Sequence, residues 1–133
     1  MTARTTLTVS AVCFRDGEGR ILTVRKAGTH AFMLPGGKLE PAETPAEAAI
    51  REISEEVGLT IDPAELVPLG TWRAAAANEA DTDVLGHVFT APLTGTPAVG
   101  NEIEELRWVT PGAFEPGLVL APLLTEHVYA ALL

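Results

Sequence analysis

The sequence lacks the features of several common protein classes. It contains one cysteine, Cys13, which excludes an internal disulfide and a cysteine-rich zinc site. Its 133 residues include no apolar run near the ~18 residues that a membrane span needs, so we expect no membrane partner. The first residues also lack a long apolar stretch behind a charged start. We therefore expect a cytoplasmic protein without a secretory signal.

Basic residues are scarce as well. Nine Lys and Arg stand against eighteen Asp and Glu, which gives a formal net charge of −9. An acidic surface repels the nucleic-acid backbone, so we expect no nucleic-acid polymer as a partner. The acidic excess has two interpretations, which are a solubilising surface and a carboxylate cluster that binds a divalent metal.

The rest of the sequence predicts one folded domain over residues 1–133, because 47% of the residues are apolar and no linker or repeat divides the chain. Strands are predicted at 6–14, 21–25, 66–75, 83–92 and 106–109, the first two paired as a hairpin. Helices are predicted at 45–57 and 116–132, and regular structure is expected to stop at 34–37. This order is typical of an α+β or α/β fold, with a mixed sheet and helices packed on its faces.

The helix at 45–57 has a signal at each end. Thr44 and Glu47 have capping-box spacing, Pro45 suits the first helical position, and Gly58 suits a left-handed C-terminal residue. The apolar residues at helical spacing are expected to face the sheet.

Three glutamates, Glu52, Glu55 and Glu56, occupy an adjoining arc of this helix. Like charges at this spacing repel each other, and Arg51 is the only cation in the helix. Mg²⁺ and Mn²⁺ prefer carboxylate and carbonyl oxygens, so a divalent ion would neutralise the cluster. On the helix alone, a solvated acidic face is the alternative.

The segment around this helix resembles a known signature. Residues 37–59, GKLEPAETPAEAAIREISEEVGL, are similar to the Nudix box of the Nudix (MutT-like) hydrolases, Gx5Ex7REUxEExGU, where U is a bulky apolar residue. Every specified position matches: Gly37, Glu43, Arg51, Glu52, Ile53, Glu55, Glu56, Gly58 and Leu59. The resemblance extends to Leu34–Gly37 and to residues 102–109. It implies an αβα sandwich that hydrolyses a nucleoside diphosphate linked to another group, X.

The resemblance also implies a role for each matched residue. Mg²⁺ or Mn²⁺ would be bound by the Gly36 carbonyl and by the carboxylates of Glu52, Glu55 and Glu56. Gly37, Glu43 and Arg51 would be structural, with Glu43 and Arg51 paired to hold the loop against the helix. Glu43 as a base or ligand is the less favoured alternative.

The general base and the phosphate-binding residues are less fixed. The resemblance places the catalytic role among Glu55, Glu56 and Glu102, with Glu104 and Glu105 as rivals. Lys38 is the first choice for binding a phosphate, and Arg25 and Lys26 come next. Because adjacent strand residues face opposite sides, at most one of these two should point into the cleft. Phe32 and Cys13 are expected to pack in the core.

The substrate is the weakest inference. Several specificity motifs of Nudix subfamilies are absent, which leaves a small MutT-like form and a (deoxy)nucleoside triphosphate as the expected substrate, cleaved by attack of water on phosphorus. The alternative is a non-catalytic domain that binds a nucleotide as a sensor. Such domains usually have eroded box glutamates, and here none is eroded. A homodimer is left open.

Overall fold

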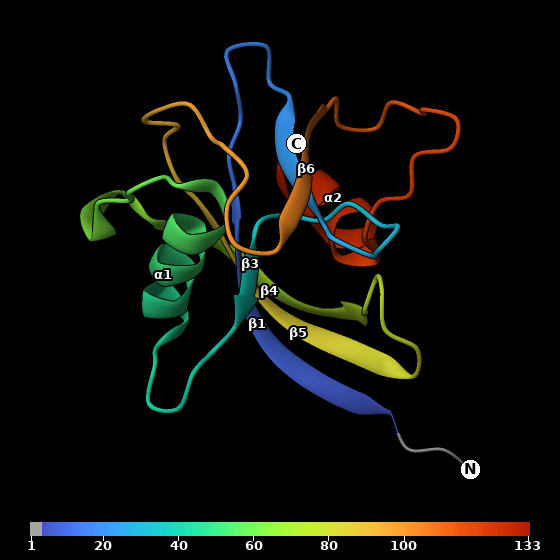
Figure 1. Ribbon diagram of the computed structural model, residues 1–133, viewed down its shortest axis with the longest axis horizontal. Helices are drawn as coiled ribbons and strands as arrows, with labels where there is room; N and C mark the ends of the chain where they lie inside the picture. Colours follow the sequence, from blue (N-terminus) through green and yellow to red (C-terminus); the bar gives the residue numbers. More distant parts are fainter. Residues whose placement is uncertain (1–3) are drawn as a thin grey trace.

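The computed structural model describes residues 4–133, which form two sheets, one long helix and a short C-terminal helical segment (Figure 1). The strands are β1 (Thr5–Cys13), β2 (Ile21–Lys26), β3 (Gly36–Lys38), β4 (Val67–Ala75), β5 (Thr82–Thr90) and β6 (Ile103–Val109). The helices are α1 (Pro45–Val57), the 3₁₀ turn η1 (Pro63–Glu65), the π-helical η2 (Leu123–Val128) and α2 (Tyr129–Ala131). No helix in this part of the chain is long and apolar enough to cross a membrane.

The larger sheet is mixed, as predicted, with the strand order β3-β1-β5-β4. β1 and β5 run parallel over nine residue pairs, while β3 and β4 are antiparallel to their neighbours. β2 and β6 form a separate antiparallel pair.

The predicted hairpin between the first two strands is wrong. β1 pairs with β3 and β5, and β2 pairs with β6. An isolated bridge links Ile21 to Arg15, which lies beyond the end of β1. The facing ends of both strands, from Ala11 to Phe14 and from Ile21 to Val24, are buried. Segments buried on both faces need cover above and below, and two packed sheets provide this cover where a local hairpin would not.

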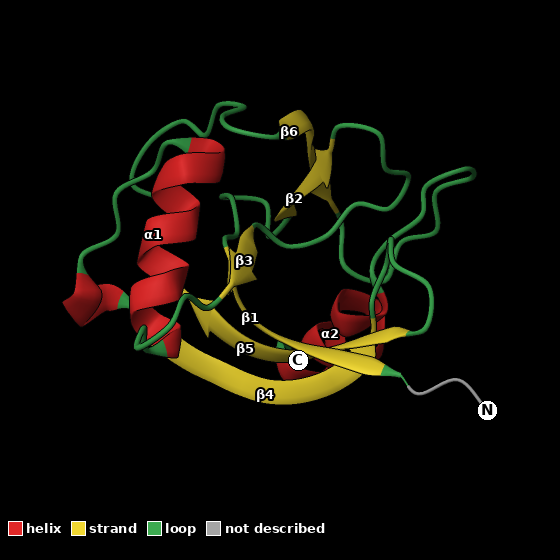
Figure 2. Ribbon diagram, turned by 60° about the horizontal axis from the view of Figure 1, so that its bottom comes forward, coloured by secondary structure: helices red, strands yellow, loops and turns green. Residues whose placement is uncertain are grey.

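Two apolar cores lie on opposite faces of β1. Val12 and Phe14 belong to the core that includes Ile53 of α1, whereas Ala11 and Cys13 belong to the core of the C-terminal helical segment. This alternation follows the two-residue period of a strand. The result is the expected αβα sandwich, and Figure 2 shows α1 beside the larger sheet and the β2–β6 pair.

Other elements also differ from the prediction, and β6 begins at Ile103 rather than at residue 106. The C-terminal helical segment begins near Pro122 rather than at residue 116, because the backbone of Phe32 pairs with Val119 and Ala121 and keeps this stretch extended. β3 forms where regular structure was expected to stop. A Cβ on Gly36 would lie 2.0 Å from the Ser10 carbonyl oxygen, so only glycine allows β3 to approach β1 this closely.

Candidate active site

Helix α1 has the predicted bounds, 45–57, because both of its ends are capped. The Thr44 hydroxyl accepts a hydrogen bond from the Glu47 backbone N–H at 3.1 Å, and the Glu47 carboxylate accepts one from the Thr44 N–H at 2.9 Å. Gly58 ends the helix in the left-handed conformation, with φ of 69°. These caps fix the direction in which the three glutamates project.

Arg51 forms hydrogen bonds and ion pairs with several carboxylates of the site. Its Nε and Nη2 donate to the two Glu43 carboxylate oxygens at 2.7 and 2.9 Å. Its Nη1 contacts Glu52 at 2.7 Å and Glu55 at 3.4 Å, and its Nη2 also donates to the Lys38 carbonyl at 3.0 Å. The hydrogen bonds from Arg51 lower the pKa of Glu43 to about 2. The expected Glu43–Arg51 contact is therefore present, and it joins the loop, β3 and α1.

Glu52 and Glu56 lie against the glycines of β3. The Glu52 side chain is 15% exposed, and a Cβ on Gly37 would lie 2.5 Å from its carboxyl carbon. The Glu56 side chain is only 5% exposed, and its Oε1 accepts a hydrogen bond from the Gly36 N–H at 2.9 Å. Gly37 thus leaves the space that the Glu52 carboxylate occupies.

Glu56 is a buried carboxylate in a crowded acidic environment. Burial raises its pKa to about 7, the Gly36 hydrogen bond and the nearby Lys26 ammonium oppose this rise, and the charges of Glu52 and Glu102 add to it. Lys26 Nζ lies 4.0 Å from Glu56 Oε2. Any further positive charge at this position would therefore stabilise the ionised form of Glu56.

The other predicted acids lie at the edge of this cluster or outside it. Glu55 is 44% exposed. Glu102 is exposed, and its backbone oxygen accepts a hydrogen bond from Ala27 at 3.0 Å, which holds the start of β6 beside the end of β2. Glu104 and Glu105 instead form ion pairs with Arg25, at 2.9 and 3.3 Å.

The predicted cations also differ in whether they reach the site. Lys26 and Lys38 both line a pocket beside β3. Arg25, next to Lys26 on β2, is engaged by Glu104, Glu105 and the Thr29 carbonyl and does not line the pocket. The structure therefore brings one of the two adjacent residues into the cleft. Phe32 is buried, with the Arg25 guanidinium 5.8 Å from its ring centre.

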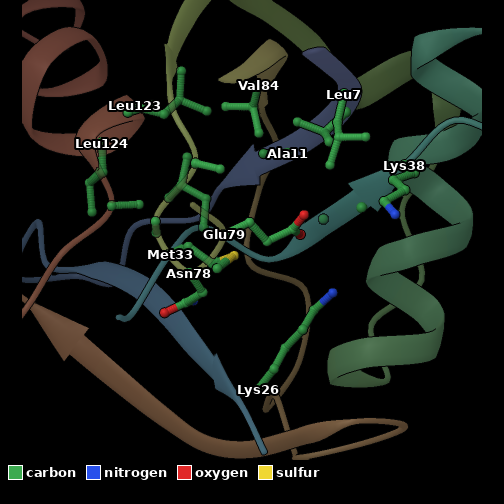
Figure 3. A pocket seen from close by; sticks show the side chains of 18 of the residues that line it. Leu7, Ala11, Lys26, Met33, Lys38, Asn78, Glu79, Val84, Leu123 and Leu124 are labelled. Atoms are coloured by element: carbon green, nitrogen blue, oxygen red, sulfur yellow. The ribbon is translucent and has the colours of Figure 1, made fainter. Parts of the chain in front are cut away.

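The pocket has a volume of about 230 Å³ and lies over the larger sheet (Figure 3). Its walls are mainly apolar, and its lysines lie toward β3 and β2. The sequence analysis did not assign to the site the residues that the end of β4, the β4–β5 loop and the C-terminal segment contribute: Ala75, Ala76, Ala77, Asn78, Glu79, Ala121, Leu123 and Leu124. The polar composition of residues 78–81 was the only sequence signal for a contribution of the β4–β5 loop to the pocket. The same composition also fits an ordinary turn.

The carboxylates suit a hard divalent cation in an open site. Within residues 4–133, no three His, Cys, Asp or Glu side chains converge closely enough to enclose an ion by themselves. The available donors are carboxylate and backbone oxygens, without soft ligands. Mg²⁺ typically uses one or two carboxylates and takes its other ligands from water and substrate phosphates. The residues therefore fit such an ion.

The fold is an αβα sandwich in which the carboxylates of α1 and the glycines of β3 lie beside an apolar pocket. Comparison with known proteins identifies the family that has this arrangement. The model of the NUDIX domain family matches residues 4–128. The chain belongs to this family.

Relatives and solved structures agree with this assignment. The chain is 34% identical to a putative 8-oxo-dGTP diphosphatase of Bacillus subtilis (strain 168), over 70% of the chain and 59% of that protein. It is 31% identical to a MutT-like protein of Streptomyces ambofaciens, over 79% of the chain and 64% of that protein. The chain thus matches about three fifths of the length of these relatives. A MutT NUDIX hydrolase structure from Burkholderia pseudomallei shares the fold, with a TM-score of 0.77 and 21% identity, over 98% of this chain and 100% of that one.

Proposed function

We propose that this chain is a divalent-metal-dependent pyrophosphohydrolase that cleaves a nucleoside diphosphate linked to X, with a (deoxy)nucleoside triphosphate as the substrate. The observation that carries the proposal is that the buried Glu56 carboxylate lies with Glu52 and Lys26 against β3. The residues of β3 and Lys26 also line the apolar pocket. The names of the two relatives, a putative 8-oxo-dGTP diphosphatase and a MutT-like protein, support it.

Each part of the site has a task in this proposal. Glu52, Glu55 and Glu56, with the Gly36 carbonyl, would hold Mg²⁺ or Mn²⁺, the kind of ion that NUDIX hydrolases generally use. When bound, such an ion neutralises pyrophosphate charge and increases the acidity of water. Lys26 and Lys38 bind phosphate oxygens through their ammonium groups.

The remaining step is proton removal from the attacking water. We assign it to Glu102, because its carboxylate is exposed and carries no ion pair within residues 4–133, and because its charge acts on Glu56, whose pKa it helps to raise. The water oxygen bonds to phosphorus, the anhydride P–O bond breaks, and the proton passes to the carboxylate. Glu55 and Glu56 are the alternatives, and the Glu102→Gln variant described below tests the assignment to Glu102.

A substrate panel tests the proposal. The protein is incubated with nucleoside triphosphates, dinucleotides and a 5′-triphosphorylated RNA, each with Mg²⁺ or Mn²⁺, and the phosphate-containing products are identified. We expect turnover of free triphosphates to the monophosphate and pyrophosphate, and little turnover of RNA, because the chain carries a net charge of −9. Tight nucleotide binding without turnover would instead indicate a sensor domain. The composition favours a cytoplasmic protein, and a homodimer stays a prediction.

A further inference from the structure

The segment between β5 and β6 is anchored to the C-terminal end of α1. The Ala98 N–H donates to the Val57 carbonyl at 3.1 Å, and the Gly100 N–H donates to the Glu56 carbonyl at 2.9 Å. Figure 1 shows this segment passing the end of α1 before it enters β6. The last carbonyls of a helix have no partner within the helix, so these two donors satisfy groups that α1 cannot pair by itself. The segment therefore holds the turn of α1 that carries Glu55 and Glu56.

The contact at Gly100 leaves no room for a side chain. A Cβ at this position would lie 2.7 Å from the Glu55 carbonyl oxygen and 3.3 Å from the Glu56 carbonyl oxygen. Both oxygens belong to the backbone of a capped helix, so neither can turn away as the end of a side chain can. A larger residue at position 100 would therefore push the segment away from α1.

Glu102 follows Gly100 by two residues and is held from the side of β2 as well. Its backbone oxygen accepts a hydrogen bond from the Ala27 N–H at 3.0 Å. The Ile103 N–H donates to the Gly100 carbonyl at 3.0 Å and closes a turn that includes Glu102. The exposed side chain of Glu102 thus depends on a backbone that is fixed between α1 and β2.

We propose that Gly100 is a positioning residue of the hydrolase. By its hydrogen bond to the end of α1 it holds the Glu102 carboxylate, which accepts the proton of the attacking water, in a fixed relation to Glu55 and Glu56. A base acts only within hydrogen-bond reach of the proton that it removes, so a displacement of about 1 Å is costly. This inference rests on the proposed function, since it concerns the base of that reaction.

Alanine substitutions at two glycines of the segment test this role. Gly100→Ala introduces the Cβ described above. Gly95→Ala is the matched control, because a Cβ there meets only the Leu59 side chain, at an ordinary contact distance of 3.5 Å. With Mg²⁺ and a triphosphate, we expect Gly100→Ala to lower kcat by about 10–100-fold and to leave KM within about twofold of the parent. Gly95→Ala should behave like the parent, and an equal loss of kcat in both variants would overturn the role of Gly100.

A double-mutant cycle with Glu102→Gln identifies the group through which Gly100 acts. Once the carboxylate is gone, Gly100→Ala should cost less than about twofold in kcat, because its effect depends on that carboxylate. An undiminished loss in the Glu102→Gln background would overturn the proposal, as would full activity of Glu102→Gln alone.

Metal affinity provides a measurement that does not depend on turnover. The Kd of Mn²⁺, measured by calorimetry without substrate, should be the same for Gly100→Ala and the parent, because the carboxylates of α1 stay in place. A Kd that rises by about tenfold or more in Gly100→Ala would show that these carboxylates had moved, and it would overturn the role of Gly100.

The remaining outcomes separate this inference from the proposed function. An active parent with independent effects of Gly100→Ala and Glu102→Gln overturns the role of Gly100 and leaves the hydrolase intact. A parent that cleaves no member of the substrate panel overturns both. If Gly100→Ala does not fold, amide exchange in the parent tests the anchor. The Gly100 N–H should then exchange at least about 100-fold more slowly than that of exposed Gly95, and equal rates would overturn the proposal.

Discussion

Arg51 joins more of the site than any sequence argument assigned to it. The guanidinium contacts Glu43, Glu52 and Glu55 and also the Lys38 carbonyl. Part of the repulsion between the helix glutamates is therefore relieved by the protein itself. The same contacts hold the loop before α1 and β3 in a fixed relation to the carboxylates.

Replacing Arg51 should therefore harm both the fold and the activity. We expect Arg51→Ala to lower the free energy of unfolding by about 1–3 kcal/mol, because several carboxylates lose a partly buried partner. Chemical denaturation measures this loss. Arg20→Ala is the matched control, since Arg20 forms exposed ion pairs with Asp16 and Glu18 and should have a much smaller effect. Equal losses in the two variants would contradict the role of Arg51.

The Glu43–Arg51 pair also predicts a dependence of stability on pH. The pKa of Glu43 is about 2 in the folded protein, against an ordinary value of 4.5. A carboxyl whose folded pKa is depressed stabilises the protein above its unfolded pKa, and this contribution is lost as the pH falls through the folded value. The stability difference between the parent and Glu43→Gln should be constant above about pH 5 and shrink toward pH 2. Denaturation curves across this range provide the measurement.

The acidic residues of α1 should divide into two groups in kinetic experiments. We expect Glu56→Gln and Glu55→Gln to lower kcat by about 100-fold or more, because a weakened metal site loses several kcal/mol of transition-state stabilisation. Glu47→Gln should be nearly silent, since Glu47 caps the helix and glutamine can replace it there. Glu102→Gln should match the Glu56 variant if Glu102 is the base, and fall between the groups if it is an auxiliary ligand. Equal losses at Glu47 and Glu56 would contradict the assignment of the helix face.

At the scale of elements, β3 is important because it is short and made mostly of glycine. Its two glycines let it approach β1 on one side and the Glu52 carboxylate on the other. The Gly36 N–H holds Glu56 from the same strand. β3 thus positions two carboxylates of α1 without contributing a charged group of its own at these points.

A single methyl group on β3 should disturb the site. In Gly37→Ala the new Cβ would lie 2.5 Å from the Glu52 carboxyl carbon, so this side chain must move. We expect kcat/KM to fall by about 10–100-fold, because small misplacements of catalytic groups are costly. Gly17→Ala is the control, since a Cβ at Gly17 meets no atom within 4 Å. Full activity in Gly37→Ala would show that the position of Glu52 is not critical.

At the scale of the whole molecule, a net charge of −9 and a clustered set of carboxylates favour cation binding. We expect Mg²⁺ or Mn²⁺ to raise Tm, because a ligand that binds only the native state stabilises it by about 1.4 kcal/mol at ten times its Kd. For a chain of this length that is a rise of several degrees. The control is NaCl at matched ionic strength, and the rise should shrink in Glu56→Gln. A Tm that responds equally to NaCl and to the divalent ions would contradict a specific site.

Features that depend on neighbouring residues could be predicted from the order of the amino acids. The bounds of α1, its capping box and the arc shared by Glu52, Glu55 and Glu56 follow from hydrogen bonds and side-chain spacing within about a dozen residues. The alternation along β1 likewise indicated a strand, although it did not identify the partners of that strand. At these places, local interactions are strong enough to favour one backbone conformation.

The pairing of distant segments, and the pocket that results from it, could be seen only in the folded molecule. β1 joins β5 across nearly seventy intervening residues, β2 joins β6, and the stretch before η2 stays extended beside Phe32. The same packing turns Lys26 toward Glu56, directs Arg25 elsewhere and brings Glu79 into the pocket. These choices depend on burial and on backbone hydrogen bonds between segments far apart in the chain, and no local pattern encodes them.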